Sequence, residues 1–284
     1  MAMNLIKTKK RIMRAIPAFL NSIIKLAVVL FILFPFYWMI ITSFKPYAET
    51  ILMPPTFWPK TFTLSAYTSI FNEMNLGIYL KNSIIITLAI IALQIPIMVP
   101  AAYAFAKYKF PGHKLMFGIV LVAFMIPGQV TFIPVYFLMA RLGILNTLLP
   151  QILPFGANAF GIFLLRQNFM QIPDEIIEAA RLDNASELKI MFRLMLPMSK
   201  ATMITLAMFS FISHWNSYFW PLVMTQSEKV RPLTIAIEKL KDVELGISWN
   251  ILMAGNVLLV FPIIIIFMFA SKKIVRAFAY KGMK

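Results

Sequence analysis

The sequence of 284 residues contains no cysteine and little charge, since Asp, Glu, Lys and Arg make up only 13% of it. Without cysteine the chain has no disulfide, no thiolate zinc site and no thiol nucleophile. It also has no G-x-x-x-x-G-K-[ST] motif, so any nucleotide hydrolysis must lie on another protein. Hydrophobic residues make up 60% of the chain and the mean hydropathy is +0.80, which excludes an ordinary soluble globular protein.

Six long stretches carry no charged residue at all, and each holds 19 to 27 residues. About 20 helical residues cross a bilayer core of about 30 Å, and a charge at mid-bilayer costs at least about 2.5 kcal/mol. The stretches are continuously apolar and lack the alternation of β-barrel strands. The sequence therefore predicts an all-α, polytopic membrane protein with six transmembrane helices. The stretches are 26–44, 82–106, 115–140, 142–165, 201–227 and 245–271.

Lysine and arginine are unevenly distributed between the predicted loops. Residues 1–20, 107–114, 166–200 and the C-terminal tail carry 18 of them, or 19 with Lys25, and the alternate loops carry 8. By the positive-inside rule, this asymmetry predicts that both termini are cytoplasmic. We therefore expect the net charge of +16 to interact with anionic membrane lipid, and we expect no nucleic-acid partner.

The N-terminus resembles a signal peptide, but its apolar run is too long and has no clear small-x-small cleavage site. We expect an uncleaved first span, preceded by a basic, partly amphipathic segment over residues 1–20 that lies along the inner membrane surface. Residues 21–284 would form one transmembrane domain. Prolines within the spans are either tolerated kinks between packed helices or the lining of a moving cavity, and the sequence leaves both readings open.

A polar segment of balanced charge, residues 173–197, separates two of the hydrophobic stretches on the predicted cytoplasmic side. We call it the polar hairpin. Its pattern predicts a helix over 174–183 that ends at Asn184, a residue that accepts a left-handed conformation. Ser186 can cap a second helix over 187–195, which the next proline would end. The residues alone leave open whether this hairpin packs only on its own domain or also binds another protein.

The polar hairpin carries a family motif. The pattern E-A-A, three residues, Gly, nine residues, Ile, one residue, Leu-Pro marks permease subunits of bacterial ATP-binding-cassette (ABC) importers. Glu178-Ala179-Ala180 begin the match, Asn184 stands at the glycine place, Leu194 at the isoleucine place, and Leu196-Pro197 end it. Four further stretches resemble the carbohydrate-uptake branch, in particular the six-span partner of the maltose-type permease pair. These stretches are 34–45, 81–94, 101–112 and 214–222.

The resemblance implies a type I importer fold in the bacterial cell membrane, with a second, different permease subunit. It also implies two ATPase subunits, which would bind ATP and Mg, and an extracytoplasmic solute-binding protein. This chain would then be no enzyme and would have no cofactor of its own. In the family, the hairpin docks in a cleft of the ATPase, and the outer loop, here residues 225–247, reaches toward the binding protein. The coupling residues implied here are Glu178, Ala179, Ala180, Arg181, Leu182, Asp183 and Asn184.

His214 is the one ionisable residue inside a predicted span. Secondary transporters usually need buried carboxylates or ion sites, and an intramembrane hydrolase or transferase would need a carboxylate or cysteine partner for the histidine. An ion-coupled carrier and such an enzyme are therefore the weaker alternatives. The other histidine, His113, is 101 positions away, so we expect no metal site.

Aromatic faces and amide groups are typical of sugar-binding surfaces, and such residues cluster around the histidine. The candidates for a polyol pathway are His214, Trp215, Asn216, Tyr218 and Trp220. Packing between helices or anchoring at the membrane interface would explain the tryptophans equally well. The sequence thus predicts a translocation subunit for a sugar, an oligosaccharide or a polyol-like solute.

Overall fold

The computed structural model describes residues 2–241 and 247–279, and every element within them is helical. The predicted all-α class is therefore confirmed. The chain divides into two compact units, which are Met1–Glu73 with Leu240–Leu258 and Met74–Lys239 with Leu259–Lys284. The predicted boundary at residue 20 falls inside helix α1 (Ala2–Ser43), and the assignment of residues 1–20 to the membrane surface stays a prediction.

Unit 1 contains α1, two short helices and the first turns of the last helix. The short helices are α2 (Tyr47–Thr50) and α3 (Ser65–Glu73), and the last helix is α14 (Trp249–Ala279). The loop after α2 is held by Glu49, whose Oε1 accepts from Thr56 Oγ1 at 2.6 Å and from the Lys60 backbone N–H at 3.0 Å. Lys45 donates to the Thr56 carbonyl, and its Nζ lies 4.7 Å from the centroid of the Trp38 ring.

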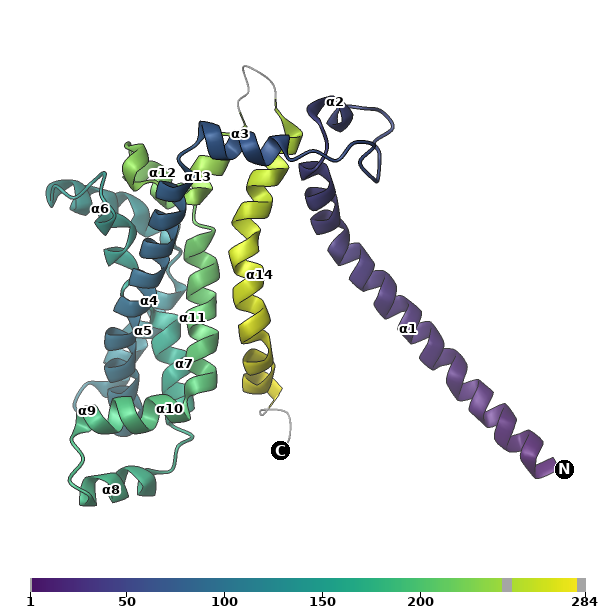
Figure 1. Cartoon of the computed structure of the whole chain (residues 1–284). Helices are drawn as coiled ribbons and strands as arrows, with labels where there is room; N and C mark the ends of the chain where they lie inside the picture. Colours follow the sequence, from purple (N-terminus) through teal and green to yellow (C-terminus); the bar gives the residue numbers. More distant parts are fainter. Residues whose placement is uncertain (1, 242–246, 280–284) are drawn as a thin grey trace. The chain divides into compact units, whose positions relative to one another are not determined.

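Unit 2 is built around α4 (Leu76–Lys107), which packs against α7, α11 and α13 (Figure 1). The other elements follow in chain order. They are α5 (His113–Met125), α6 (Gly128–Arg141), η1 (Leu149–Gln151), η2 (Leu153–Phe155), α7 (Ala159–Phe169), α8 (Asp174–Leu182), α9 (Glu187–Lys189), the π-helical η3 (Ile190–Met195), α10 (Leu196–Met198), α11 (Lys200–Trp215), α12 (Phe219–Met224), η4 (Glu228–Val230) and α13 (Leu233–Glu238), with the rest of α14.

Within the described residues, three helices are long and apolar enough to cross a membrane, at Asn21–Ser43, Leu76–Lys107 and Trp249–Phe269. Two bent pairs raise the number to five if each is one span. α5 and α6 meet at 97°, and the helix Glu187–Met198 meets α11 at 83°. The structure thus shows an all-helical membrane protein with three to five candidate spans, fewer than the six charge-free stretches that the sequence contains.

Proline explains where the predicted spans break. Pro127 lies between α5 and α6 in an extended conformation. A helix is interrupted at proline because its ring fixes φ and its nitrogen has no hydrogen to donate. Pro150 and Pro154 are each the second residue of a 3₁₀ turn, η1 and η2, so the stretch 142–165 reaches a regular α-helix only at α7.

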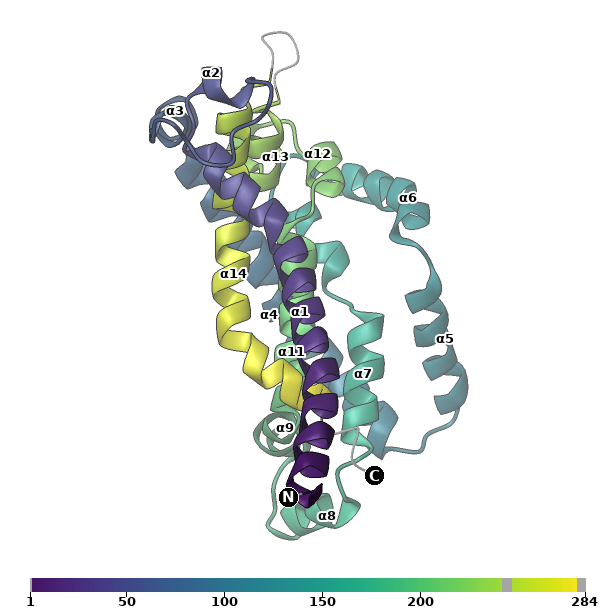
Figure 2. The same ribbon diagram turned by 90° about the vertical axis from the view of Figure 1, so that its right-hand side faces the viewer.

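The polar hairpin and the helices of the outer loop lie at opposite ends of α4, as both views show (Figures 1 and 2). A hydrophobic cluster joins α4 to α7 and to the hairpin. Its buried members are Val99, Ala102, Tyr103, Leu165, Phe169, Ile172, Ile177, Ile190, Met191, Met195 and Leu206. The hairpin is therefore part of the fold of unit 2 rather than a solvated linker.

Candidate functional site

The first helix of the polar hairpin ends as the sequence predicts. α8 stops at Leu182, and Asn184 adopts a left-handed conformation with φ of 56°. The N–H of Ala185 donates to the carbonyl of Ala180 at 3.0 Å, and the N–H of Asn184 donates to that of Arg181 at 2.9 Å. These two bonds form a Schellman motif, which satisfies carbonyls left free at the helix end.

The second helix of the hairpin starts at the predicted residue but runs further than predicted. The Ser186 side chain caps it by accepting from the Lys189 N–H at 3.4 Å. The prediction that Pro197 ends this helix is wrong, because α10 continues to Met198. Pro197 is the second residue of α10, and the continuous helix Glu187–Met198 ends one residue after it.

One face of the hairpin is buried against its own domain. Ile177 of α8 is 3% exposed, and the second helix buries Ile190, Met191 and Met195 in the same cluster. Burying such side chains contributes roughly 1.5–3 kcal/mol each. The hairpin is thus packed in a fixed position against α4 and α7.

A lysine at the end of α4 holds the beginning of the hairpin. The ammonium of Lys107 donates to the carbonyl of Ile172 and to Oδ1 of Asp174, both at 2.6 Å. The Lys107 side chain is only 7% exposed, so its charge is directed at these two oxygens. The hydrogen bond from Lys107 and its positive charge hold the pKa of Asp174 below its ordinary value.

A carboxylate in the second helix joins both hairpin helices to α4. Glu187 Oε1 accepts from Arg181 Nε at 2.9 Å, and its Oε2 accepts from the hydroxyl of Tyr103 at 2.7 Å. Arg181 also donates to the Tyr108 hydroxyl at 3.1 Å, and the hydrogen bond to Glu187 raises the pKa of its guanidinium. Charged hydrogen bonds therefore connect α8 and the second hairpin helix to the end of α4.

The opposite face of the hairpin is exposed. Glu178, Ala179, Asp183 and Asn184 are exposed, and the side chain of Leu182 is 84% exposed. Nearby, Leu188 at the start of the second helix is 65% exposed. Of the seven predicted coupling residues, Ala180 is half-buried and Arg181 forms the ion pair with Glu187. The remaining five form an exposed surface that combines small, apolar and acidic side chains.

The predicted pathway residues do not all line one cavity, but His214 and Trp220 both pack against the ring of Phe155, at centroid distances of 4.6 and 5.1 Å, and line one small cavity together. Trp215 is 2% exposed, stacks on Phe211 and donates its indole N–H to the carbonyl of Leu259 at 2.9 Å. Trp220 donates to the carbonyl of Pro150 at 2.8 Å, and the Asn216 amide donates to its own helix. Tyr218 is exposed at the start of α12.

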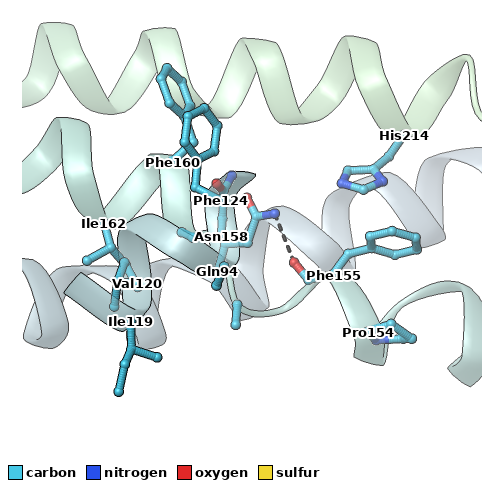
Figure 3. A pocket seen from close by; sticks show the side chains of 13 residues that line it. Gln94, Ile119, Val120, Phe124, Pro154, Phe155, Asn158, Phe160, Ile162 and His214 are labelled. Atoms are coloured by element: carbon cyan, nitrogen blue, oxygen red, sulfur yellow. Dashed lines mark hydrogen bonds between the residues drawn. The ribbon is translucent and has the colours of Figure 1, made fainter. Parts of the chain in front are cut away.

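His214 is also the one predicted pathway residue that lines a roomier cavity of unit 2. This cavity has a volume of about 530 Å³ and is lined by 13 residues from α4, α5, α7, α11 and the η2 segment (Figure 3). The imidazole lies beside the ring of Phe155, with 4.6 Å between the ring centroids. Gln94, which the sequence analysis did not single out, donates to the Phe155 carbonyl at 3.0 Å. A glutamine in the middle of a charge-free span could have revealed it, because a polar side chain at that depth needs a partner.

The outer loop is attached to the other end of α4. The Asn82 amide donates to the carbonyls of Lys229 and Arg231, both at 2.9 Å, and the Ser83 hydroxyl accepts from the Leu233 N–H at 2.8 Å. Glu228 accepts from the Tyr79 hydroxyl. Residues 242–246 of this loop lie outside the described part of the chain.

Comparisons with known proteins agree with this arrangement. Residues 97–280 match the family described as "Binding-protein-dependent transport system inner membrane component". The chain is 32% identical to the arabinooligosaccharides transport system permease protein AraQ of Halalkalibacterium halodurans, over 88% of this chain and 91% of that protein. It is 29% identical to the sn-glycerol-3-phosphate transport system permease protein UgpE of Brucella abortus, over 89% of this chain and 93% of that protein.

A solved structure has the same fold. It is a chain of a bacterial ABC transporter involved in the import of the acidic polysaccharide alginate, with a TM-score of 0.82 and 25% sequence identity. The alignment covers 90% of this chain and 96% of that one. This chain therefore belongs to the family of inner membrane components of binding-protein-dependent transport systems, and it is a multi-pass ABC importer permease of the carbohydrate-uptake type, without catalytic activity or a cofactor of its own.

Proposed function

We propose that the chain is one of two different translocation subunits of an ATP-driven importer for a sugar, oligosaccharide or polyol-like solute. Its partners would be a second permease, two ATPase subunits and an extracytoplasmic solute-binding protein. The name of AraQ supports an oligosaccharide, and the name of UgpE makes a small phosphorylated polyol the competing substrate.

The proposed topology has six spans and cytoplasmic termini. The three long helices, the bent pair α5 and α6, and α11 would supply five crossings, and the segment 142–165 with α7 would supply the sixth through its 3₁₀ turns. The lysine and arginine distribution supports the orientation. In this proposed orientation the polar hairpin lies on the cytoplasmic side, where ATPase subunits would bind, and the outer loop lies on the side of a binding protein.

The two-faced hairpin is the observation that carries the coupling role. One face is held on α4 by Lys107 and Glu187, while Glu178, Ala179 and Leu182 are exposed on the other. A small, apolar and acidic helix face fits a cleft in a partner, which would cover the 84% exposed side chain of Leu182. Closure of the ATPases would then move the hairpin and, with it, α4.

The energy required is modest. Reversing a 1:99 ratio between inward- and outward-facing states takes about 5.5 kcal/mol of differential stabilisation. Nucleotide binding at two ATPase sites can provide this amount. The hairpin must therefore keep its position on α4 while it transmits force. The ion pairs of Lys107 and Glu187 help to hold it there.

Substitution of Glu178 tests the proposal. Glu178→Ala should leave membrane insertion intact, because the side chain is exposed. We expect uptake into vesicles containing the assembled importer to fall roughly tenfold, as for an interface residue worth about 1.4 kcal/mol. ATPase activity should persist without a matching rate of uptake.

An exposed residue of the same side serves as the control. Lys109→Ala lies in the turn after α4, outside the hairpin, and should transport normally. Normal transport by Glu178→Ala would contradict the coupling role. Uptake that follows an ion gradient in the absence of ATP would contradict the importer proposal as a whole.

A further inference from the structure

The cavity of about 530 Å³ lies midway along α4, between the two ends that hold the outer loop and the polar hairpin. Gln94, which lines it, is 11 residues after Ser83 and nine residues before Tyr103. At 1.5 Å per residue these separations are about 16 Å and about 14 Å along the helix. The cavity is thus at the depth where membrane transporters hold their substrates, near the middle of the bilayer.

The polar groups of the cavity come from three separate elements. They are Gln94 of α4, Asn158 at the start of α7 and His214 of α11, and Figure 3 shows the His214 imidazole beside Phe155. Gln94 is 3% exposed, and its Nε2 donates to the Phe155 carbonyl while its Oε1 has no partner among the described residues. The Asn158 Oδ1 caps α7 by accepting from the Gly161 N–H at 2.9 Å.

These groups leave hydrogen-bonding capacity inside the cavity. The amide nitrogen of Asn158 and both ring nitrogens of His214 make no hydrogen bond to any described residue. Together with Gln94 Oε1, they offer at least one donor and at least one acceptor. A hydroxyl group both donates and accepts, so a polyhydroxylated solute matches this set.

The rest of the lining is apolar and includes three phenylalanine rings, Phe124, Phe155 and Phe160. The faces of Phe124 and Phe160 stack on each other, with centroids 5.4 Å apart. A volume of about 530 Å³ lies within the range of small-molecule sites, which are mostly apolar with a few placed polar groups. Sugar rings present C–H faces to such walls.

The lining contains no Lys, Arg, Asp or Glu. A phosphate or carboxylate that entered the cavity would lose water without gaining a lysine or arginine partner from this chain, which is strongly unfavourable. The neutral lining therefore distinguishes between the substrate classes that the two relatives' names suggest.

We infer that this cavity is a subsite for an uncharged saccharide, with Gln94, Asn158 and His214 as its hydrogen-bonding residues, and that it excludes phosphorylated polyols. This inference rests on the proposed function and names the substrate class of the pathway. Gln94 is a specificity-determining residue because it is the most buried of the three polar groups.

Direct binding tests the inference without the selectivity of a solute-binding protein. The full chain is purified in detergent with the subunits that accompany it, and binding of arabinotriose, maltotriose, raffinose and sn-glycerol 3-phosphate is measured by calorimetry. The variants are Gln94→Leu and His214→Phe, and Gln171→Leu is the matched control at an exposed glutamine outside the cavity. Gel filtration checks folding, and His214→Phe breaks no hydrogen bond to a described residue.

At least one neutral trisaccharide should bind about 100-fold more tightly than sn-glycerol 3-phosphate. Gln94→Leu and His214→Phe should each weaken saccharide binding roughly tenfold, the effect of one lost hydrogen bond, and Gln171→Leu should bind normally. Binding of none of the three saccharides, preferential binding of sn-glycerol 3-phosphate, or unchanged binding by His214→Phe would overturn the inference.

The coupling test separates this inference from the proposed function. If Glu178→Ala uncouples ATPase activity from uptake while the cavity variants behave as wild type, only the subsite is wrong. If no ATPase subunit accompanies the chain, the proposed function itself fails.

Discussion

At the residue scale, buried charges act here by holding segments in place. Glu49 and Lys45 are 6% and 2% exposed, and both make their hydrogen bonds within the short loop of unit 1. Burial by itself would raise the pKa of the Glu49 carboxyl. The hydrogen bonds from Thr56 and the Lys60 backbone, with the charge of Lys45, outweigh this and hold that pKa below its ordinary value.

This lowered pKa predicts an acid dependence of stability. A carboxyl whose pKa is lower in the folded state stabilises the fold above its ordinary value of 4.5, and this contribution disappears as the pH falls through the lower, folded pKa. Between about pH 5 and pH 3, the melting temperature of wild type should therefore fall by more than that of Glu49→Gln. At pH 7 the variant should melt roughly 2–4 °C lower, as expected for one net hydrogen bond. Parallel melting curves at all pH values would contradict the assignment.

The placement of individual side chains shows what the sequence could not reveal about the pathway. Trp215 and His214 are neighbours in the sequence, and both suited a sugar site by residue type. The structure buries Trp215 against Phe211 and directs His214 into the cavity, because successive residues of α11 lie about 100° apart around the helix. Gln94 joins His214 only through the packing of α4 on α11, which no local pattern in a single sequence contains.

At the scale of elements, local signals predicted the hairpin well. Asn184 and Ser186 determine where α8 ends and α9 begins, since both act through their own backbone neighbourhood. A different cause explains why the structure has three to five candidate spans rather than six. Pro127, Pro150 and Pro154 divide charge-free stretches into short helices, and hydrophobicity alone does not reveal the angle at such a break.

The attachment of the hairpin to α4 gives a prediction at this scale. Lys107→Met removes two charged hydrogen bonds, to the Ile172 carbonyl and to Asp174. Because a hydrogen bond to a charged group contributes about 1.5–3 kcal/mol, amide hydrogen exchange over α8 should be at least about tenfold faster. Mass spectrometry of peptides covering 174–186 measures this directly.

A second cation provides the control for that measurement. Lys114→Met changes an exposed lysine of α5 and should leave exchange in the hairpin unchanged. Equal exchange in Lys107→Met and wild type would show that apolar packing of Ile177 and its neighbours suffices to hold the hairpin.

At the scale of the whole molecule, α4 connects the three parts of the proposed mechanism. Its first turns bind the outer loop, its middle lines the cavity, and its last turns hold the hairpin. Hydrophobicity and charge placed these parts in order along the chain, and the family motif identified the hairpin. Only the folded unit shows that a single helix joins them.

The central claim is that the exposed hairpin face docks on an ATPase subunit, and a cross-link tests it most directly. Because the chain has no cysteine, Leu182→Cys introduces a single thiol on that face, and Leu142→Cys introduces one in the exposed turn after α6 as control. With a thiol-to-amine cross-linker in membranes containing the assembled importer, we expect a covalent adduct with the ATPase from Leu182→Cys and none from Leu142→Cys. No adduct from Leu182→Cys, or equal adducts from both, would contradict the account.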